Sequence, residues 1–304
     1  MSAKLKIKIK KQCTWYSFMI LSIICLIVLT YIPMATTVKY SFYDARTLGF
    51  EGSYTGLTNY SVLVSNSGFW KSILNTLILT GLSLLQIPIG YVMAYMINGI
   101  RNSRLQSMFR IGFYLPSIIT GVSVVLIFQV VLKENGGLLN TALSWLLRSD
   151  IKVGWLSDAN VSKFGATILN LWQNTGYCML ICLANLQAIS SDIYEAAKID
   201  GAGGLKKLYY IATPLMKECF IFLFITNVIS GFSRFTDLFI IGGNIASGRP
   251  GGSLQTLLMY IYQYSFEYPN FGMASAGAMI LFVMTLSVTI LNLSWTGFFK
   301  KEER

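Results

Sequence analysis

Four polar residues interrupt the fourth long apolar stretch of the chain at helical spacing. Polar groups are costly in hydrocarbon, so on a buried helix they usually face the interior of a bundle or a watery cavity. Three of them share a helix face at i, i+1 and i+4, and the first lies one turn earlier. They could hydrogen-bond a polar solute or join packed helices to one another. The four are Asn170, Gln173, Asn174 and Tyr177.

The fifth apolar stretch offers a second polar set near its far end. It includes Arg234, and an arginine inside an apolar span is costly unless it has a partner or a role. Asp237 at i+3 could neutralise it, or its side chain could reach outer headgroups. Alternatively, Arg234 faces a cavity and holds a carboxylate through two parallel hydrogen bonds. The set comprises Asn227, Ser230, Gly231 and Arg234.

Several kinds of chemistry are excluded by what the sequence lacks. The chain has no histidine, so Ser-His or Cys-His catalysis and histidine-ligated metals are ruled out. The phosphate-binding pattern GxxxxGK[ST] is absent, so the usual means of binding and hydrolysing ATP is missing. We therefore predict no catalytic residues, no metal site and no cofactor bound by this chain.

Composition places these residues in a membrane. Of the 304 residues, 54% are apolar and 12% are charged, whereas soluble domains average about 25% charged residues. This excludes a soluble enzyme, a disordered chain and an ordinary nucleic-acid binder. The net charge of +11 is typical of basic residues held on the cytoplasmic side of a membrane protein.

Six apolar runs are long enough to cross a bilayer, which takes about 20 helical residues. With the N-terminus inside, the inner segments hold 14 Lys and Arg in 67 residues, and the outer segments hold 8 in 96. The positive-inside rule then places both termini in the cytoplasm. We predict an all-α integral membrane protein with spans at 17–38, 73–97, 108–132, 164–186, 219–241 and 273–295.

The longest inner segment, 187–218, has an unusual order of residues. Asp192 is a candidate N-cap with Glu195 three residues later, and the glycines from Gly201 to Gly204 break the helix. Helical periodicity then resumes until Pro214. The pattern indicates a helix-turn-helix on the membrane surface, either as a docking element for another protein or as a plain connecting loop.

This segment resembles a known motif. Glu195-Ala196-Ala197, followed by Asp200-Gly201-Ala202 and Pro214, is similar to the EAA loop of bacterial ABC importer permeases. The resemblance extends over nearly the whole chain and is strongest to the sugar (maltose-type, binding-protein-dependent) permeases. Two departures stand out: Ser190 replaces a frequent proline, and the outer loop 242–252 differs from the compact Thr-x-Gly-Gly-Pro of many relatives.

The resemblance implies an assembly in the bacterial cytoplasmic membrane. Its expected partners are a second homologous permease, two ABC ATPase subunits that bind ATP and Mg, and an extracytoplasmic solute-binding protein. Residues 1–16 would be a cytoplasmic basic segment, 17–297 the transmembrane domain with a coupling loop at 190–214, and 298–304 a cytoplasmic tail. The residues expected to couple to the ATPase are Glu195, Ala196, Ala197, Asp200 and Gly201.

The resemblance also implies that the polar sets of the fourth and fifth stretches form part of a sugar-binding wall. If Arg234 faces the cavity, the transported oligosaccharide would be acidic and contain uronate; otherwise it would be neutral, like maltose or raffinose. An ion-coupled secondary transporter is a further alternative, but it leaves the EAA segment unexplained. A membrane enzyme is another, but the outer carboxylates form no tight cluster: Asp44, Glu51, Asp150 and Asp158.

Overall fold

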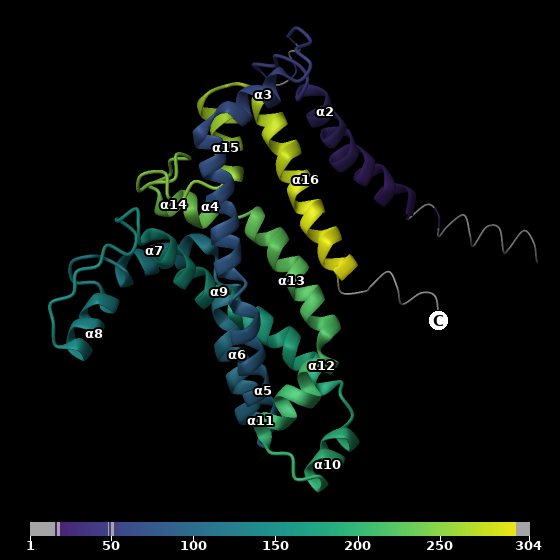
Figure 1. The fold of residues 1–304 in the computed structure, drawn as a ribbon, viewed down its shortest axis with the longest axis vertical. Coiled ribbons are helices and arrows are strands. Elements are labelled where there is room, and N and C mark those ends of the chain that lie inside the picture. The colour runs from purple at the N-terminus through teal and green to yellow at the C-terminus, as the bar shows by residue number, and fades with distance from the viewer. Residues whose placement is uncertain (1–15, 17–18, 48, 50–51, 296–304) are drawn as a thin grey trace, which may run out of the picture. The chain divides into compact units, whose positions relative to one another are not determined.

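A computed structural model describes residue 16, residues 19–47, residue 49 and residues 52–295. In this described part all regular elements are helices, joined by turns and loops, and there is no β-strand; Tyr43 and Tyr54 form an isolated bridge (Figure 1). The all-α prediction is therefore confirmed. The predicted tail 298–304 and the basic segment 1–16, except for Tyr16, lie outside the described residues.

Contacts divide the chain into two compact units. The first comprises residues 1–66 and 264–280. Within it, the Asn59 amide donates to the carbonyls of Ser41 and Tyr43, both at 3.0 Å, and the Gly272 amide donates to Ala45 at 2.9 Å. Its described elements are η1 (Ile27–Tyr31), α2 (Ile32–Tyr40), α3 (Thr58–Ser65), most of η3 (Gln263–Glu267) and the start of α16 (Phe271–Trp295).

The second unit, residues 67–263 and 281–304, contains the predicted polar sets and the EAA segment. Its longest helix, α9, packs against α5 and α6, and α13 packs against α4. In chain order its described elements are α4 (Ser67–Ser83), α5 (Gln86–Asn98), α6 (Ser103–Ile118), α7 (Gly121–Val131), α8 (Leu138–Leu147), α9 (Ser162–Gln187), α10 (Ser191–Ile199), α11 (Gly204–Lys207), η2 (Leu208–Ala212), α12 (Thr213–Leu215), α13 (Lys217–Phe232), α14 (Thr236–Ile241) and α15 (Leu257–Tyr262).

Each predicted apolar run coincides with a helix or a pair of helices. Four helical segments in the described part are long and apolar enough to cross a membrane: Met19–Tyr40, Ser67–Asn98, Lys217–Ile241 and Phe271–Trp295. Two of them join successive helices, α4 with α5 and α13 with α14. Two further runs qualify only as pairs with a sharper bend, α6 with α7 at 97° and α9 with α10 at 75°.

The third run departs from the prediction. A continuous span was expected at 108–132, but the helix ends at Ile118 and restarts at Gly121 after the bend. The backbone at Ile119 is extended, and its carbonyl accepts a hydrogen bond from Gln173 Nε2 at 3.3 Å. The apolar pattern did not reveal this break because both halves of the run are apolar.

Two glycines allow the helices around α9 to approach closely. A Cβ on Gly176 would lie 2.0 Å from the Phe113 carbonyl oxygen of α6, and a Cβ on Gly90 of α5 would lie 2.9 Å from the backbone nitrogen of Met179. The core beside them contains buried Cys178, Met179 and other apolar residues. Small residues at helix interfaces are typical of membrane proteins, where close backbone packing stabilises the bundle.

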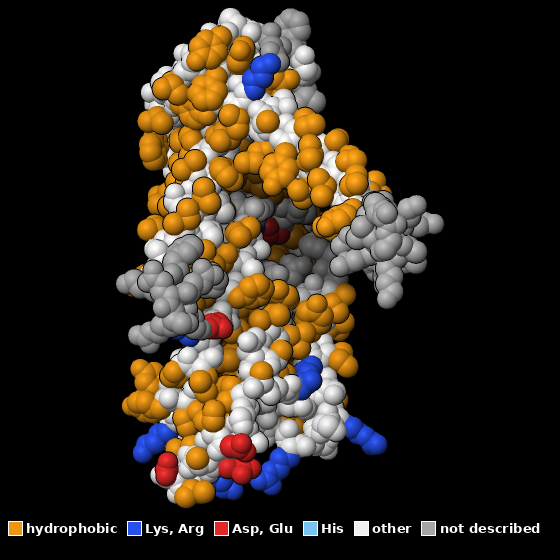
Figure 2. Space-filling model, turned by 90° about the vertical axis from the view of Figure 1, so that its right-hand side faces the viewer, with side chains coloured by type: hydrophobic (Ala, Val, Ile, Leu, Met, Phe, Trp, Pro, Cys, Tyr) orange, Lys and Arg blue, Asp and Glu red, His pale blue; other side chains and the backbone are white. Residues whose placement is uncertain are grey.

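Charged side chains are unevenly distributed on the surface. In Figure 2 they gather around α10 and α11 of the second unit, whereas the helical surface next to them is mostly hydrophobic. Lys198, Lys206 and Asp200 belong to this charged region. The distribution fits helices that cross hydrocarbon and a connecting segment that does not.

The contact at Gly176 generates a prediction about stability. Gly176→Ala should lower the thermal midpoint of the purified protein, because the new methyl group meets backbone atoms of Phe113 that cannot rotate away; overpacking of this kind costs about 1–3 kcal/mol. The matched control is Gly112→Ala on α6, where a Cβ meets nothing within 4 Å. Equal thermal midpoints for the two variants would show that α6 moves away from the new methyl group without loss of stability.

Candidate functional site

The second unit contains a polar cavity of about 240 Å³ between α5, α9 and α13. Seven of the eight residues predicted for substrate contact line it, which brings the two polar sets together. Because these residues come from different spans, only packing could show that they share one cavity. The lining residues are Ser83, Gln86, Asn170, Asn174, Tyr177, Thr226, Asn227, Ser230, Gly231 and Arg234.

On α9, three of the four predicted residues line the cavity. Asn170, Asn174 and Tyr177 line it at i, i+4 and i+7, and the Asn174 amide donates to the Asn170 carbonyl at 3.1 Å. The side-chain oxygen of Asn170 is buried without a partner in the described structure. Gln173 does not line the cavity, since its amide donates to Ile119 at the α6–α7 break. Its predicted place on the shared face was wrong.

On α13 the predicted residues differ in what they contribute. Asn227 is buried and accepts a hydrogen bond from the Gln86 side chain of α5. Gly231 permits close packing, because a Cβ there would lie 2.6 Å from the Thr80 side chain of α4. Ser230 is exposed to the cavity. The α13 set therefore both lines the cavity and packs the helices around it.

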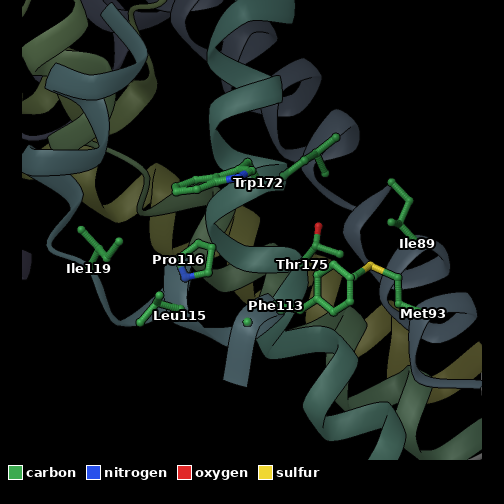
Figure 3. Close-up of a pocket in the computed structure, with 11 residues that line it drawn as sticks. Ile89, Met93, Phe113, Leu115, Pro116, Ile119, Trp172 and Thr175 are labelled. Carbon is green, nitrogen blue, oxygen red and sulfur yellow. The ribbon is translucent and has the colours of Figure 1, made fainter. Parts of the chain in front are cut away.

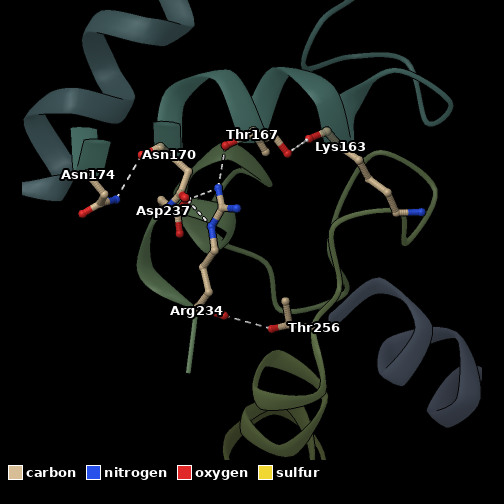
Figure 4. A network of polar contacts seen from close by, with 8 residues as sticks. Lys163, Thr167, Asn170, Asn174, Arg234, Asp237 and Thr256 are labelled. Carbon is tan, nitrogen blue, oxygen red and sulfur yellow. Dashed lines mark hydrogen bonds and ion pairs between the residues drawn. The ribbon is translucent and has the colours of Figure 1, made fainter. Parts of the chain in front are cut away.

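Arg234 lies in the break between α13 and α14 and is 7% exposed. Its Nε and Nη2 donate to one oxygen of Asp237, at 2.8 and 2.5 Å, and Nη2 also donates to the Ala166 carbonyl at 2.6 Å (Figure 4). Asp237 therefore occupies the Nε–Nη2 edge of the guanidinium. The predicted pairing with Asp237 is therefore present, and the Nε–Nη2 edge is not free for a ligand carboxylate. The remaining nitrogen, Nη1, is buried without a partner among the described residues.

Three lining residues were missed by the sequence analysis. Gln86 is the most informative, because it is a buried amide inside an apolar run, and the argument applied to α9 would have found it. Ser83 and Thr226 carry small hydroxyls, which are common in such helices and gave no signal. Thr226 Oγ1 donates to the Phe222 carbonyl at 2.9 Å, so part of its hydrogen bonding is local.

The EAA segment folds as the short helix α10, a turn, and a helical return through α11, η2 and α12. Its N-cap is Ser190, whose Oγ accepts from the Asp192 amide at 3.3 Å, so the predicted cap at Asp192 was wrong. The helix ends in a Schellman motif: Ala202 N donates to Ala197 O at 2.9 Å and Gly201 N to Lys198 O at 3.2 Å. Gly201 has φ +71°, which confirms the predicted turn.

Two tyrosines of α5 attach this segment to the bundle. The Tyr95 hydroxyl donates to the Gly204 carbonyl at 2.8 Å, and the Tyr91 hydroxyl lies 3.0 Å from Thr213 Oγ1. Of the predicted coupling residues, Ala197 is buried, whereas the other four are exposed: Glu195, Ala196, Asp200 and Gly201. Large apolar side chains are exposed beside them at Ile199, Leu205, Tyr209 and Tyr210.

Comparison with known proteins decides the family. The profile described as "binding-protein-dependent transport system inner membrane component" matches residues 86–294, which include the cavity and the EAA segment. The chain belongs to this family. Among its relatives, the lactose transport system permease protein LacF of Rhizobium radiobacter is 30% identical, with 90% of this chain and 88% of LacF covered. The multiple sugar-binding transport system permease protein MsmF of Streptococcus mutans is 29% identical, with 94% and 96% covered.

The fold also matches a solved structure. The chain aligns with a TM-score of 0.80 and 22% identity to a chain of a bacterial ABC transporter involved in the import of the acidic polysaccharide alginate, covering 96% of this chain and 98% of that one. Family and fold agree with the apolar helices of this chain. It is therefore an integral membrane component of an ABC transporter and not an enzyme in its own right.

The Arg234–Asp237 pair generates a second prediction. Asp237→Asn should lower the thermal midpoint strongly, since breaking a buried ion pair costs about 3–5 kcal/mol when one charge stays behind. The double variant Arg234→Gln/Asp237→Asn should recover part of that loss, because neither charge remains. A double variant no more stable than Asp237→Asn alone would show that Arg234 acts mainly through its hydrogen bond to Ala166.

Proposed function

We propose that this protein is one permease subunit of an ATP-driven importer of oligosaccharides. The observation that carries the proposal is the polar cavity, in which Arg234 Nη1 and the Asn170 side-chain oxygen have no partner in the described structure. Unsatisfied buried polar groups are costly, and a polyhydroxylated ligand would supply both an acceptor and a donor. The printed names of LacF and MsmF, which refer to lactose and multiple sugars, support the same substrate class.

The size of the cavity supports a two-subunit pathway. Its volume of about 240 Å³ is below the range of roughly 300–1,000 Å³ that is usual for ligand pockets. An oligosaccharide would need further wall, and we infer that a second, homologous permease supplies it. An extracytoplasmic solute-binding protein would deliver the sugar, as the family description implies.

We infer that recognition acts mainly on sugar hydroxyls. Asp237 neutralises Arg234 and occupies two of its nitrogens, which leaves amides, hydroxyls and the Tyr177 ring to contact a neutral sugar. A second candidate, an acidic oligosaccharide with uronate units, is favoured by the unpartnered Nη1. That group could donate to a carboxylate, although without the bidentate geometry that makes arginine selective for one.

Coupling to ATP hydrolysis would use the segment 190–214. Its exposed carboxylates and the apolar side chains at Ile199 and Leu205 form a surface suited to docking an ATPase subunit. ATP and Mg would bind to that partner, with one ATPase on each permease. Motion of the docked segment would reach α5 through Tyr95 and Tyr91, and α5 carries Gln86 into the cavity.

Membrane topology completes the proposal. Six spans result if each bent helix pair counts as one crossing. We infer from the excess of basic residues in alternate segments that both termini, and with them the segment 190–214, lie in the cytoplasm of a bacterial cell. The sugar would then enter from the opposite face as the cavity alternates between outward and inward access.

Coupling can be tested at the Schellman turn. Gly201→Val should reduce sugar-stimulated ATP hydrolysis by the reconstituted complex at least fivefold, because a β-branched residue resists the positive φ at that position. Gly203→Val is the matched control, since Gly203 has φ −70° and a Cβ there meets nothing within 4 Å. Normal stimulation with Gly201→Val would remove this turn from the coupling pathway.

The sugar site can be tested on α9. Asn170→Leu should raise the concentration of neutral oligosaccharide needed for half-maximal ATPase stimulation about tenfold, as expected for a lost hydrogen bond of about 1.4 kcal/mol. Asn185→Leu is the control, because Asn185 lies on the same helix, is exposed and does not line the cavity. No difference between the variants would argue against the cavity as the sugar site.

The same assay separates the two substrate candidates. We expect stronger stimulation by neutral oligosaccharides than by uronate oligosaccharides of equal length. The reverse order, abolished by Arg234→Gln, would establish the acidic substrate instead.

A further inference from the structure

A second hollow lies on the other side of α9. It is a groove of about 580 Å³ between α5, α6 and α9, at the level where α6 ends. Its wall is almost entirely apolar, and Figure 3 shows Met93, Phe113 and Trp172 around it, with Thr175 among them. A polar solute would find few partners in such a groove, whereas a hydrocarbon chain would bury apolar surface against it.

The groove does not belong to the polar cavity. Successive residues of a helix are rotated by about 100°, so Trp172 and Gly176 of the groove lie about 120–160° around α9 from Asn170 and Asn174 of the cavity. The two hollows therefore open on different faces of α9. If the polar cavity faces the translocation pathway, as proposed above, the groove faces away from it and toward the bilayer.

A cation lies on the same stripe of α6 as the groove. Gln106, Arg110 and Phe113 are spaced at i, i+4 and i+7, so Arg110 lies one turn nearer the start of α6 than Phe113. Arg110 Nη2 donates to Gln106 Oε1 at 2.9 Å, and Gln106 in turn donates to the Ile97 carbonyl of α5 at 3.1 Å. Within the described residues Arg110 forms no ion pair, and its Nε has no partner.

The length of this arrangement matches one leaflet of a membrane. Arg110 and Ile119 lie about 13 Å apart along α6 at 1.5 Å per residue, close to half of the ~30 Å hydrocarbon thickness. An unpaired arginine within an apolar span is costly unless it meets a headgroup or a partner.

We propose that the groove holds one acyl chain of a phospholipid of the leaflet nearest the start of α6, and that Arg110 contacts its headgroup phosphate. The acyl chain would cover Met93 of α5, Phe113 of α6 and Trp172 of α9. The phosphate would supply the anion that Arg110 lacks. Bound lipid would thereby hold α6 against α9 on the N-terminal side of the α6–α7 bend, where Gly176 packs against Phe113.

The test uses fluorescence quenching of Trp172 in the complete transporter complex, reconstituted with phospholipids brominated on their acyl chains. The Trp172 contribution is the difference between the native complex and Trp172→Phe. We expect strong quenching of this contribution by brominated lipid and at least twofold weaker quenching in Gly112→Leu. Gly112 lines the groove and a Cβ there meets nothing within 4 Å, so the new side chain fills the groove. Gly81→Leu on α4 is the control, because its position is equally open and lies outside the groove.

The headgroup contact is tested by comparing brominated phosphatidylglycerol with brominated phosphatidylcholine. We expect the anionic lipid to quench Trp172 at lower mole fraction, a preference that Arg110→Gln removes and Arg110→Lys keeps. Unquenched Trp172 in the complex would overturn the proposal and point to a protein partner over the groove. Quenching that is the same in Gly112→Leu and Gly81→Leu would also overturn it. Sugar-stimulated ATP hydrolysis, measured on the same samples, reports separately on the proposed import function.

Discussion

Satisfying the backbone at the helix breaks is the constraint on which the arrangement of the second unit depends. A carbonyl or amide released inside an apolar bundle must find a partner, because no water is available in hydrocarbon. The break after α6 is closed by Gln173, which donates to the Ile119 carbonyl. The break after α13 is closed by Thr256, whose hydroxyl donates to the Arg234 carbonyl at 3.1 Å. At both breaks, a polar side chain is therefore used to satisfy a backbone carbonyl.

This constraint explains which polar groups remain for a ligand. Arg234 holds Asp237 and the Ala166 carbonyl, and Asn227 holds Gln86 and its own helix through the Leu223 carbonyl at 2.7 Å. What is left is a short set of unpartnered atoms around one cavity, chiefly Arg234 Nη1 and the oxygen of Asn170. A site built in this way is pre-formed, because its walls are fixed by hydrogen bonds that also stabilise the fold.

The same packing links the cavity to the segment 190–214. Along α5, Gln86 reaches the cavity, Gly90 lets α9 approach closely, and Tyr91 and Tyr95 bond to residues of that segment. One helix thus contacts both the cavity proposed to bind the sugar and the surface proposed to meet the ATPase. A displacement of the segment would move the cavity wall without any need for a flexible relay.

The sequence alone determined the fold class, the position of the apolar runs, the turn at Gly201 and the family resemblance. These features depend on hydropathy, on local spacing and on the freedom of glycine, which are properties of neighbouring residues. It could not separate Gln173 from Asn174, or find the bend at Ile119, because these depend on where a freed carbonyl meets a distant side chain. Nor could it choose between the roles open to Arg234. Asp237 was visible at i+3, but only the folded chain brings the Ala166 carbonyl to the same guanidinium and leaves Nη1 unpartnered.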